Sequence, residues 1–366
     1  MKPPFKADQV GSLLRPAELI EARAKAKRGE IDVEGLRAVE DRSIRAVIAK
    51  QESIGLQAVT DGEFRRDWWH VDFLAAFDGV EGYTAPLVVG FKDTEEQPPM
   101  IRVNGKVKRT QPIFVDSFRF MKSAVVNPAQ NTAKQTIPAP AMLHLRPGRS
   151  GISKAAYPDL AEFWQDVGAA YRAEIMDLGA AGCTYLQLDD TSFAYLCDEK
   201  FAGALARRGD DPKKLAWTYA QAINAAVENR PAGMAITMHT CRGNFKSTWV
   251  ASGGYEPVVE ALFSANLDGF FMEFDSERAG TFEPLRYLPK GKQVVLGLVT
   301  TKFGELEDKD TIKRRIDAAA KFVPLENLCL SPQCGFSSTH HGNNLSQDDQ
   351  WRKLARIVEV AREVWG

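Results

Sequence analysis

The strongest constraint on the fold is an alternation between short apolar runs and longer amphipathic stretches. Eight runs are rich in β-branched residues or leucine and nearly continuous, which is typical of parallel strands buried on both faces. They span residues 8–12, 56–63, 140–145, 184–190, 234–241, 269–274, 293–300 and 327–335. Strand alternating with helix about eight times predicts a single (β/α)₈ barrel, or TIM barrel, over residues 1–366.

The stretches between these runs have helical spacing of their apolar residues. Four of them begin near an aspartate, a residue that favours the N-cap position of a helix. We expect helices over residues 16–29, 32–55, 159–178, 211–229, 310–322 and 348–365. An open, doubly wound sheet is the main alternative fold. No G-x-G-x-x-G sequence follows the first run, which disfavours a dinucleotide-binding version of that sheet.

One segment, residues 83–125, departs from this rhythm. Its apolar residues alternate at period two, and it carries the turn-forming sequence VNGK at positions 103–106. This pattern predicts a β-hairpin inserted between the second and third barrel strands.

Charge and composition exclude several classes of protein. The chain has 47 basic and 48 acidic residues, so we expect neither a nucleic-acid partner nor an anionic membrane surface. It has no run of about 18 apolar residues and no signal-peptide core, so we expect no membrane span. Five scattered cysteines, an odd number, favour a cytoplasmic protein with free or metal-bound thiols over a disulfide framework.

Polar residues gather at the C-terminal ends of the predicted strands. In a TIM barrel, residues at this rim form the active site. Seven of the eight strand ends supply such residues: Gly11, Ser12, Asp61, Glu63, His144, Gln187, Asp189, Asp190, His239, Cys241, Glu273 and Cys334. The seventh strand contributes no evident functional group.

Four of these rim residues suggest a metal site. His239 and Cys241 are two residues apart on one strand, so both side chains point to the same face. Imidazole and thiolate are ligands that suit Zn²⁺, and Cys334 and Glu273 add a second thiolate and a carboxylate. A single buried cysteine is usually structural. The coincidence of four ligand types at neighbouring rim positions favours a catalytic zinc.

Six motifs resemble the cobalamin-independent methionine synthases, specifically their catalytic C-terminal barrel and its shorter, single-barrel relatives. The resemblance covers nearly the whole chain. It is carried by VGSLLRP (10–16), TDGEFRRDWW (60–69), LQLDD (186–190), HTC (239–241), MEF (272–274) and SPQCG (331–335).

The resemblance implies a function and a role for each matching residue. The enzyme would use a zinc-bound thiolate to transfer a methyl group to homocysteine, with 5-methyltetrahydrofolate or a methyl-corrinoid protein as donor. The implied zinc ligands are His239, Cys241, Glu273 and Cys334. Gly11 and Ser12 would bind the carboxylate of the amino acid, and Glu63 and Asp189 its amine. A homodimer is also expected, because barrels of this kind often pair.

The chain departs from the family pattern at two places. The fourth-strand motif continues as Asp190-Thr191-Ser192 instead of Glu-Pro-Ala, and the seventh-strand stretch 297–304 lacks the family's proton-donating histidine. His340, His341 and His144 are the remaining candidates for an acid or base. For the first two, a purely polar loop is an equally good interpretation.

Three other functions remain open from the sequence. One is a zinc-dependent alkyl- or epoxide-thiol transferase, which an open, apolar pocket would favour. Another is a metal-free lyase that resembles the uroporphyrinogen decarboxylases, whose rim would carry arginines and one aspartate. The third is a non-catalytic zinc protein, which would need a closed metal site.

Overall fold

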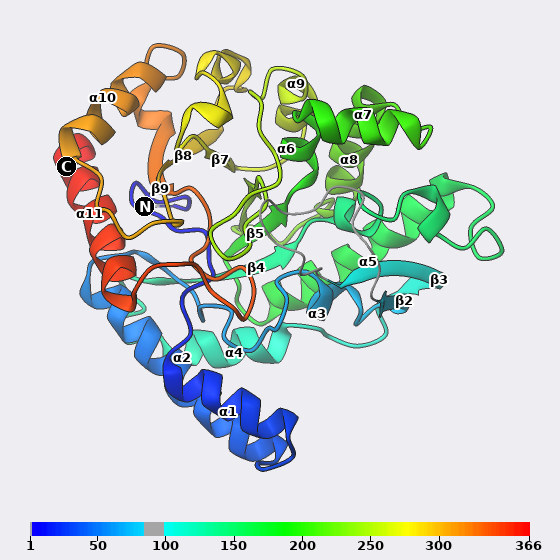
Figure 1. Ribbon diagram of the computed structural model, residues 1–366, viewed down its shortest axis with the longest axis horizontal. Helices are drawn as coiled ribbons and strands as arrows, with labels where there is room; N and C mark the ends of the chain where they lie inside the picture. Colours follow the sequence, from blue (N-terminus) through cyan, green and yellow to red (C-terminus); the bar gives the residue numbers. More distant parts are fainter. Residues whose placement is uncertain (1, 84–98) are drawn as a thin grey trace.

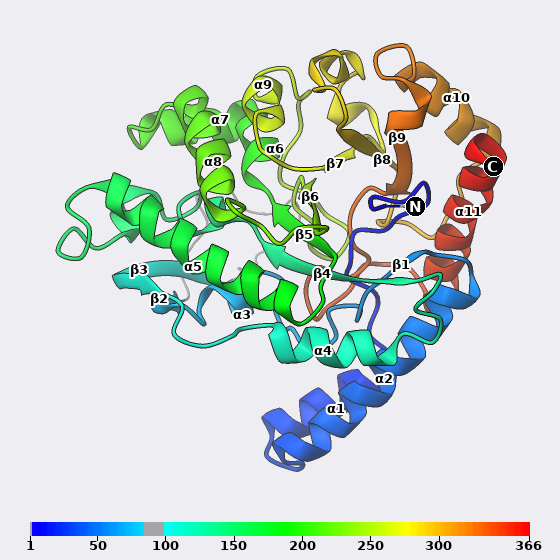
Figure 2. The ribbon, with the colours of Figure 1, turned by 180° about the vertical axis from the view of Figure 1, so that it is seen from behind.

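The computed structural model describes residues 2–83 and 99–366, and it confirms the predicted parallel barrel (Figure 1). Seven parallel strands form a curled sheet in the order β1-β4-β5-β6-β7-β8-β9 (Figure 2). They are β1 (Ala58–Val59), β4 (Thr132–Pro138), β5 (Tyr185–Asp190), β6 (Ala235–Thr240), β7 (Gly269–Glu273), β8 (Gln293–Val299) and β9 (Leu328–Pro332). Nearly every residue in them is buried, as expected for strands covered on both faces.

The segment before α1 closes the gap between β9 and β1. Ala7 forms a parallel bridge with Leu330, and the amide of Asp8 donates to the Leu330 carbonyl at 3.0 Å. On the other side, the amide of Leu13 donates to the Gly62 carbonyl at 3.1 Å. The predicted first strand is therefore present as this closing segment. It is not a full strand, because Gly11 has a φ of +146° and departs from strand geometry.

A fully buried ion pair fixes this segment inside the barrel. Lys134 of β4 donates to Asp8 Oδ1 at 3.1 Å, and the Tyr185 hydroxyl of β5 donates to Asp8 Oδ2 at 2.8 Å. Both charged side chains are 0% exposed. The Lys134 ammonium also lies 4.1 Å from the ring centroid of Phe271. Asp8 thus ties the N-terminal segment to two strands of the sheet.

The predicted third strand over residues 140–145 is wrong. The strand here is β4, and residues Pro140–Leu143 form the short 3₁₀ helix η1. Two prolines, Pro138 and Pro140, lack the N–H groups that would continue the ladder. The sequence pattern failed because β4 turns polar residues, including Lys134 and Thr136, into the barrel interior, where they are buried.

The insertion after β1 contains the antiparallel pair β2 (Asp78–Tyr83) and β3 (Met100–Lys108), consistent with the predicted hairpin. Residues 84–98 of the predicted insertion lie outside the described residues. The predicted VNGK turn is wrong, since it lies inside β3. Gly79, at a φ of +76°, packs against this position, and a Cβ there would lie 2.5 Å from the Lys106 carbonyl oxygen.

The last part of the predicted insertion is a helix, α4 (Val115–Ala124). Val115, Phe118 and Met121 are buried at a spacing of three residues, which is a helical and not a strand period.

The remaining helices surround the sheet, and α1 extends away from the barrel beside α2 (Figure 1). Their bounds are α1 (Ala17–Lys27), α2 (Val33–Ser53), α3 (Val71–Leu74), α5 (Leu160–Ala180), α6 (Ser192–Leu196), α7 (Glu199–Arg207), α8 (Pro212–Ala226), α9 (Val259–Phe263), α10 (Lys309–Ala319) and α11 (Gln347–Trp365). The short 3₁₀ helices besides η1 are Arg149–Gly151, Glu277–Ala279, Glu283–Tyr287 and Leu325–Asn327.

Helix starts follow the predicted capping chemistry, with two shifts. Asp159 and Asp211 cap α5 and α8 through their side chains. Asp308 caps α10 in place of the expected Asp310, and Ser346 caps α11 in a capping box with Asp349. Within the described part of the chain, no helix combines the length and the apolar character needed to cross a membrane.

Replacing Lys134 with methionine should destabilise the barrel strongly, because it leaves the Asp8 carboxylate buried without its cation. We expect the free energy of unfolding in urea to fall by about 3–5 kcal/mol. The control is Lys309→Met, which removes an exposed pair with Glu363 and should cost under about 1 kcal/mol. Equal losses in the two variants would contradict a special role for the buried pair.

Candidate metal centre and adjoining cleft

Four of the predicted rim residues converge on one point. His239 is the next-to-last residue of β6, and Glu273 is the last residue of β7. Cys241 directly follows β6, and Cys334 lies two residues beyond β9. Each offers one ligand atom, and these atoms all lie within 4.8 Å of one another. All four residues are buried. The cluster could hold a metal ion.

The two thiols are spaced for a shared metal. Cys241 Sγ lies 3.5 Å from Cys334 Sγ, far beyond the ~2.05 Å of a disulfide. Two sulfur ligands of a tetrahedral zinc, each at ~2.3 Å from it, would lie about 3.8 Å apart, close to the observed spacing. The hydrogen bond from Cys241 also lowers the pKa of Cys334, because it stabilises the thiolate. The donor set and its spacing therefore fit zinc.

The His239 ring has one edge toward the cluster and one edge toward a carboxylate. Nε2 lies 3.1 Å from the Gln333 carbonyl oxygen and 3.7 Å from Glu273 Oε1. Nδ1 lies 3.6 Å from Asp189 Oδ1. A carboxylate beside the second ring nitrogen is the usual way in which a metal-binding histidine is oriented.

Both oxygens of Glu273 have donors from the protein. The Arg242 amide donates to Oε1 at 3.1 Å, and Arg278 Nη2 donates to Oε2 at 2.9 Å. Burial raises the pKa of Glu273, but His239 and the charge of Arg278 outweigh it and bring this pKa down to about 2. Glu273 is therefore ionised at neutral pH.

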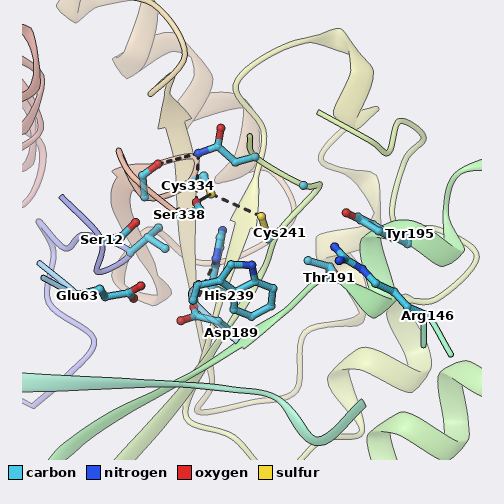
Figure 3. Close-up of a pocket in the computed structure, with 15 residues that line it drawn as sticks. Ser12, Glu63, Arg146, Asp189, Thr191, Tyr195, His239, Cys241, Cys334 and Ser338 are labelled. Carbon is cyan, nitrogen blue, oxygen red and sulfur yellow. Dashed lines mark hydrogen bonds and ion pairs between the residues drawn. The ribbon is translucent and has the colours of Figure 1, made fainter. Parts of the chain in front are cut away.

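Three residues of the cluster, His239, Cys241 and Cys334, form part of the wall of a cleft. Figure 3 shows Ser12 and Glu63 at one end of this cleft and Arg146 and Tyr195 at the other. The three residues of the cluster lie between the two ends. The lining residues are Val10, Ser12, Glu63, Trp69, Arg146, Asp189, Thr191, Tyr195, His239, Cys241, Gly243, Asn244, Cys334, Gly335 and Ser338.

Glu63 is held in an uncommon backbone conformation. Its φ is +61°, and its amide donates to Asp61 Oδ1 at 2.8 Å. Its carboxylate accepts from the Thr136 hydroxyl at 2.8 Å and lies 3.4 Å from Arg66 Nη1. Burial raises the pKa of Glu63, and the charge of Arg66 opposes that rise. The turn thus directs one carboxylate into the cleft.

Two glycines make room for the polar groups at this end. A Cβ on Gly11 would lie 3.2 Å from Glu63 Oε1 and 2.8 Å from Thr136 Cγ2. A Cβ on Gly335 would lie 1.9 Å from Ser12 Oγ. Gly11 therefore leaves space beside the Glu63 carboxylate, and its role in binding a substrate stays a prediction.

None of the three candidate acid–base histidines is among the described residues that line the cleft. His144 is buried, and its Nδ1 lies 2.9 Å from the Tyr219 hydroxyl. His340 and His341 pack beside Trp68, with ring centroids 6.0 and 6.1 Å away. Their acid–base role stays a prediction.

Two polar residues near the cluster, Asn244 and Lys302, were not predicted from the sequence. Asn244 donates to the Gly335 carbonyl at 3.0 Å and to Ser338 Oγ at 3.2 Å, and so joins two loops of the rim. Lys302, which follows β8 and is buried, donates to Asn244 Oδ1 at 3.3 Å. The one sequence feature that could have indicated Lys302 is its position two residues after the apolar run 293–300. The stretch that follows the seventh predicted strand thus places one polar side chain, Lys302, near the rim.

His144 should stay neutral at physiological pH, because burial lowers its pKa to about 4. The unfolded chain, with a histidine pKa of about 6.5, then binds a proton that the folded protein does not. Stability should therefore fall as the pH is lowered from about 6.5 toward 4, with about 2 kcal/mol lost from this residue by pH 5. Urea unfolding of wild type and His144→Gln at pH 7.5 and 5 measures the difference. An NMR titration of His144 near pH 6.5 would contradict it.

Comparison with known proteins identifies the family to which the chain belongs. Residues 5–363 match the family model described as the catalytic domain of cobalamin-independent synthases. The Bacillus subtilis protein YxjH, which is uncharacterized, is 46% identical over 100% of this chain and 96% of that protein. A 5-methyltetrahydropteroyltriglutamate–homocysteine methyltransferase from Mycolicibacterium paratuberculosis is 23% identical over 99% of this chain, which spans 43% of that enzyme.

Solved structures agree with this placement. A putative vitamin-B12-independent methionine synthase from Listeria monocytogenes has a TM-score of 0.81 and 40% identity, covering 100% of this chain and 99% of that one. A B12-independent methionine synthase from Shewanella sp. W3-18-1, solved with selenomethionine, shares the fold at a TM-score of 0.73 and 20% identity, covering 98% and 97%. The chain belongs to the family of cobalamin-independent synthase catalytic domains.

Proposed function

We propose that this protein is a zinc-dependent methyltransferase that converts homocysteine to methionine, with 5-methyltetrahydrofolate as the methyl donor. One observation carries the proposal: the ligand atoms of His239, Cys241, Glu273 and Cys334 lie within 4.8 Å of one another, and three of these residues line the same cleft as Ser12, Glu63 and Asp189. The family supports a methyltransferase of the cobalamin-independent methionine synthase kind. Relatives named for this reaction support the choice of thiol and donor.

His239, Cys241, Glu273 and Cys334 would hold the zinc. Bound there, zinc would supply the Lewis acidity that keeps a substrate thiol deprotonated, and therefore nucleophilic, at neutral pH. Both Glu273 oxygens already have protein donors, so this carboxylate stays ionised and paired whether or not it also binds a metal.

The other end of the cleft would bind the amino-acid part of homocysteine. Glu63 and Asp189 present carboxylates to an ammonium group, and Ser12 presents its hydroxyl to a carboxylate. Fixing both groups would orient the thiol toward the metal-binding residues and lower the entropic cost of the encounter. An open, apolar pocket would instead have favoured an alkyl- or epoxide-thiol transferase.

The family and the geometry of the cleft do not bear on two of the predicted partners. A methyl-corrinoid donor and a homodimer stay predictions, and a donor screen and a mass measurement in solution would test them. Location in the cytoplasm likewise stays a prediction from the sequence.

Purified wild-type protein should contain about one zinc per chain, measured by elemental analysis after reconstitution under reducing conditions. Cys241→Ser and Cys334→Ser should each lose at least tenfold in zinc affinity, because each removes one thiolate. Cys329→Ser is the control: it also removes a buried free thiol, but one packed with Val10, Phe271 and Val295 inside the barrel. A wild type that cannot be loaded, or equal losses in all three variants, would refute the zinc site.

Gly11→Ala should raise the Kd for homocysteine at least tenfold, because the new Cβ crowds the Glu63 carboxylate. Gly209→Ala is the control, since Gly209 also has a positive φ, +92°, but no atom within 4 Å of the added Cβ. Backbone strain should cost Gly209→Ala about 1 kcal/mol of stability. Gly11→Ala should lose more, because its Cβ would also lie 2.8 Å from Thr136 Cγ2. Calorimetric titration of zinc-loaded protein gives the Kd. An unchanged Kd in Gly11→Ala would argue against Glu63 as the amine-binding group.

A further inference from the structure

The function proposed above leaves one polar end of the cleft without a role. Arg146, which follows η1, and Tyr195 of α6 both line the cleft. In Figure 3 the guanidinium and the hydroxyl point inward, on the side of Cys241 away from Ser12 and Glu63. Tyr195 is only 2% exposed.

These two groups contact each other, and neither is satisfied by the rest of the protein. Arg146 Nη1 and the Tyr195 hydroxyl are both buried, and among residues 2–83 and 99–366 neither has a hydrogen-bond partner outside this pair. Burial raises the pKa of Tyr195, while the charge of Arg146 and its contact with the hydroxyl oppose that rise. The hydroxyl therefore stays protonated. Because this pair also lines the cleft, its remaining hydrogen-bonding capacity is available to a group that enters from outside the protein.

The charges divide the cleft into two halves. Arg146 is the one cationic side chain among the described residues that line it, and two carboxylates, Glu63 and Asp189, lie toward the other end. An arginine fork and a hydroxyl together are suited to an oxyanion. An amino acid held at Glu63 and Ser12 has its thiol near Cys241. The anion at Arg146 then belongs to the second substrate.

We propose that Arg146 and Tyr195 form a subsite for an anionic group of the methyl donor, such as a carboxylate or a phosphate. The subsite seats the donor on the opposite side of the metal-binding residues from the amino acid. This assignment rests on the proposed function for the identity of the two substrates, but the anion site itself does not.

Direct binding of inorganic sulfate, titrated calorimetrically into zinc-loaded enzyme at constant ionic strength, tests the site. We expect Arg146→Gln to weaken sulfate binding at least tenfold, Tyr195→Phe about threefold, and Arg146→Lys to retain part of the affinity. Arg119→Gln, which removes an exposed arginine of α4 paired with Asp116, should leave it unchanged. Sulfate binding that is absent from wild type, or unchanged in both Arg146→Gln and Tyr195→Phe, overturns the proposal.

Steady-state kinetics with 5-methyltetrahydrofolate then identify which substrate carries the anion. Arg146→Gln should raise the donor KM at least tenfold and leave the homocysteine KM within twofold of wild type. A rise confined to the homocysteine KM would assign Arg146 to the amino-acid carboxylate and overturn the donor subsite. A wild type that binds sulfate through Arg146 but neither zinc nor homocysteine would refute the proposed function and leave the anion site standing.

Discussion

The candidate site depends on the parallel register of strands that are buried on both faces. Because β6, β7 and β9 run in the same direction, the ends of all three meet at one rim. The pairing of Asp189 with His239, and of Glu273 with Gly297, places polar residues at equal heights around that rim. Chain positions almost a hundred residues apart thereby come within a few ångströms. No local motif could hold these four ligands together without the barrel.

Closure of the barrel and construction of the cleft use the same N-terminal segment. Asp8 anchors this segment inside the barrel through Lys134 and Tyr185. Three residues further on, Gly11 leaves the space that Glu63 occupies, and Ser12 packs against Gly335 beside Cys334. This one segment therefore both stabilises the barrel and shapes the end of the cleft where Glu63 and Ser12 lie. The opposite end, with Arg146 and Tyr195, is built independently from the segments after β4 and β5.

The sequence predicted most of the strands and the metal cluster because both leave local patterns. Apolar runs marked β5 to β9, and His239-x-Cys241 placed two ligands on one strand face. Strand β4 was missed since its interior positions are polar, with Lys134 paired to a residue 126 positions away. The roles of Arg146 and Lys302 depend on burial and on distant partners, which no local spacing encodes. Likewise, helix α4 was hidden by an apparent period of two.

The central claim is that two cysteines, one histidine and one glutamate bind zinc in a site that accepts a thiol. X-ray absorption at the zinc edge tests it most directly. We expect two sulfur and two nitrogen or oxygen neighbours in the reconstituted protein, and a third sulfur after homocysteine is added. A metal with four sulfur neighbours, or a spectrum that homocysteine does not change, would contradict it.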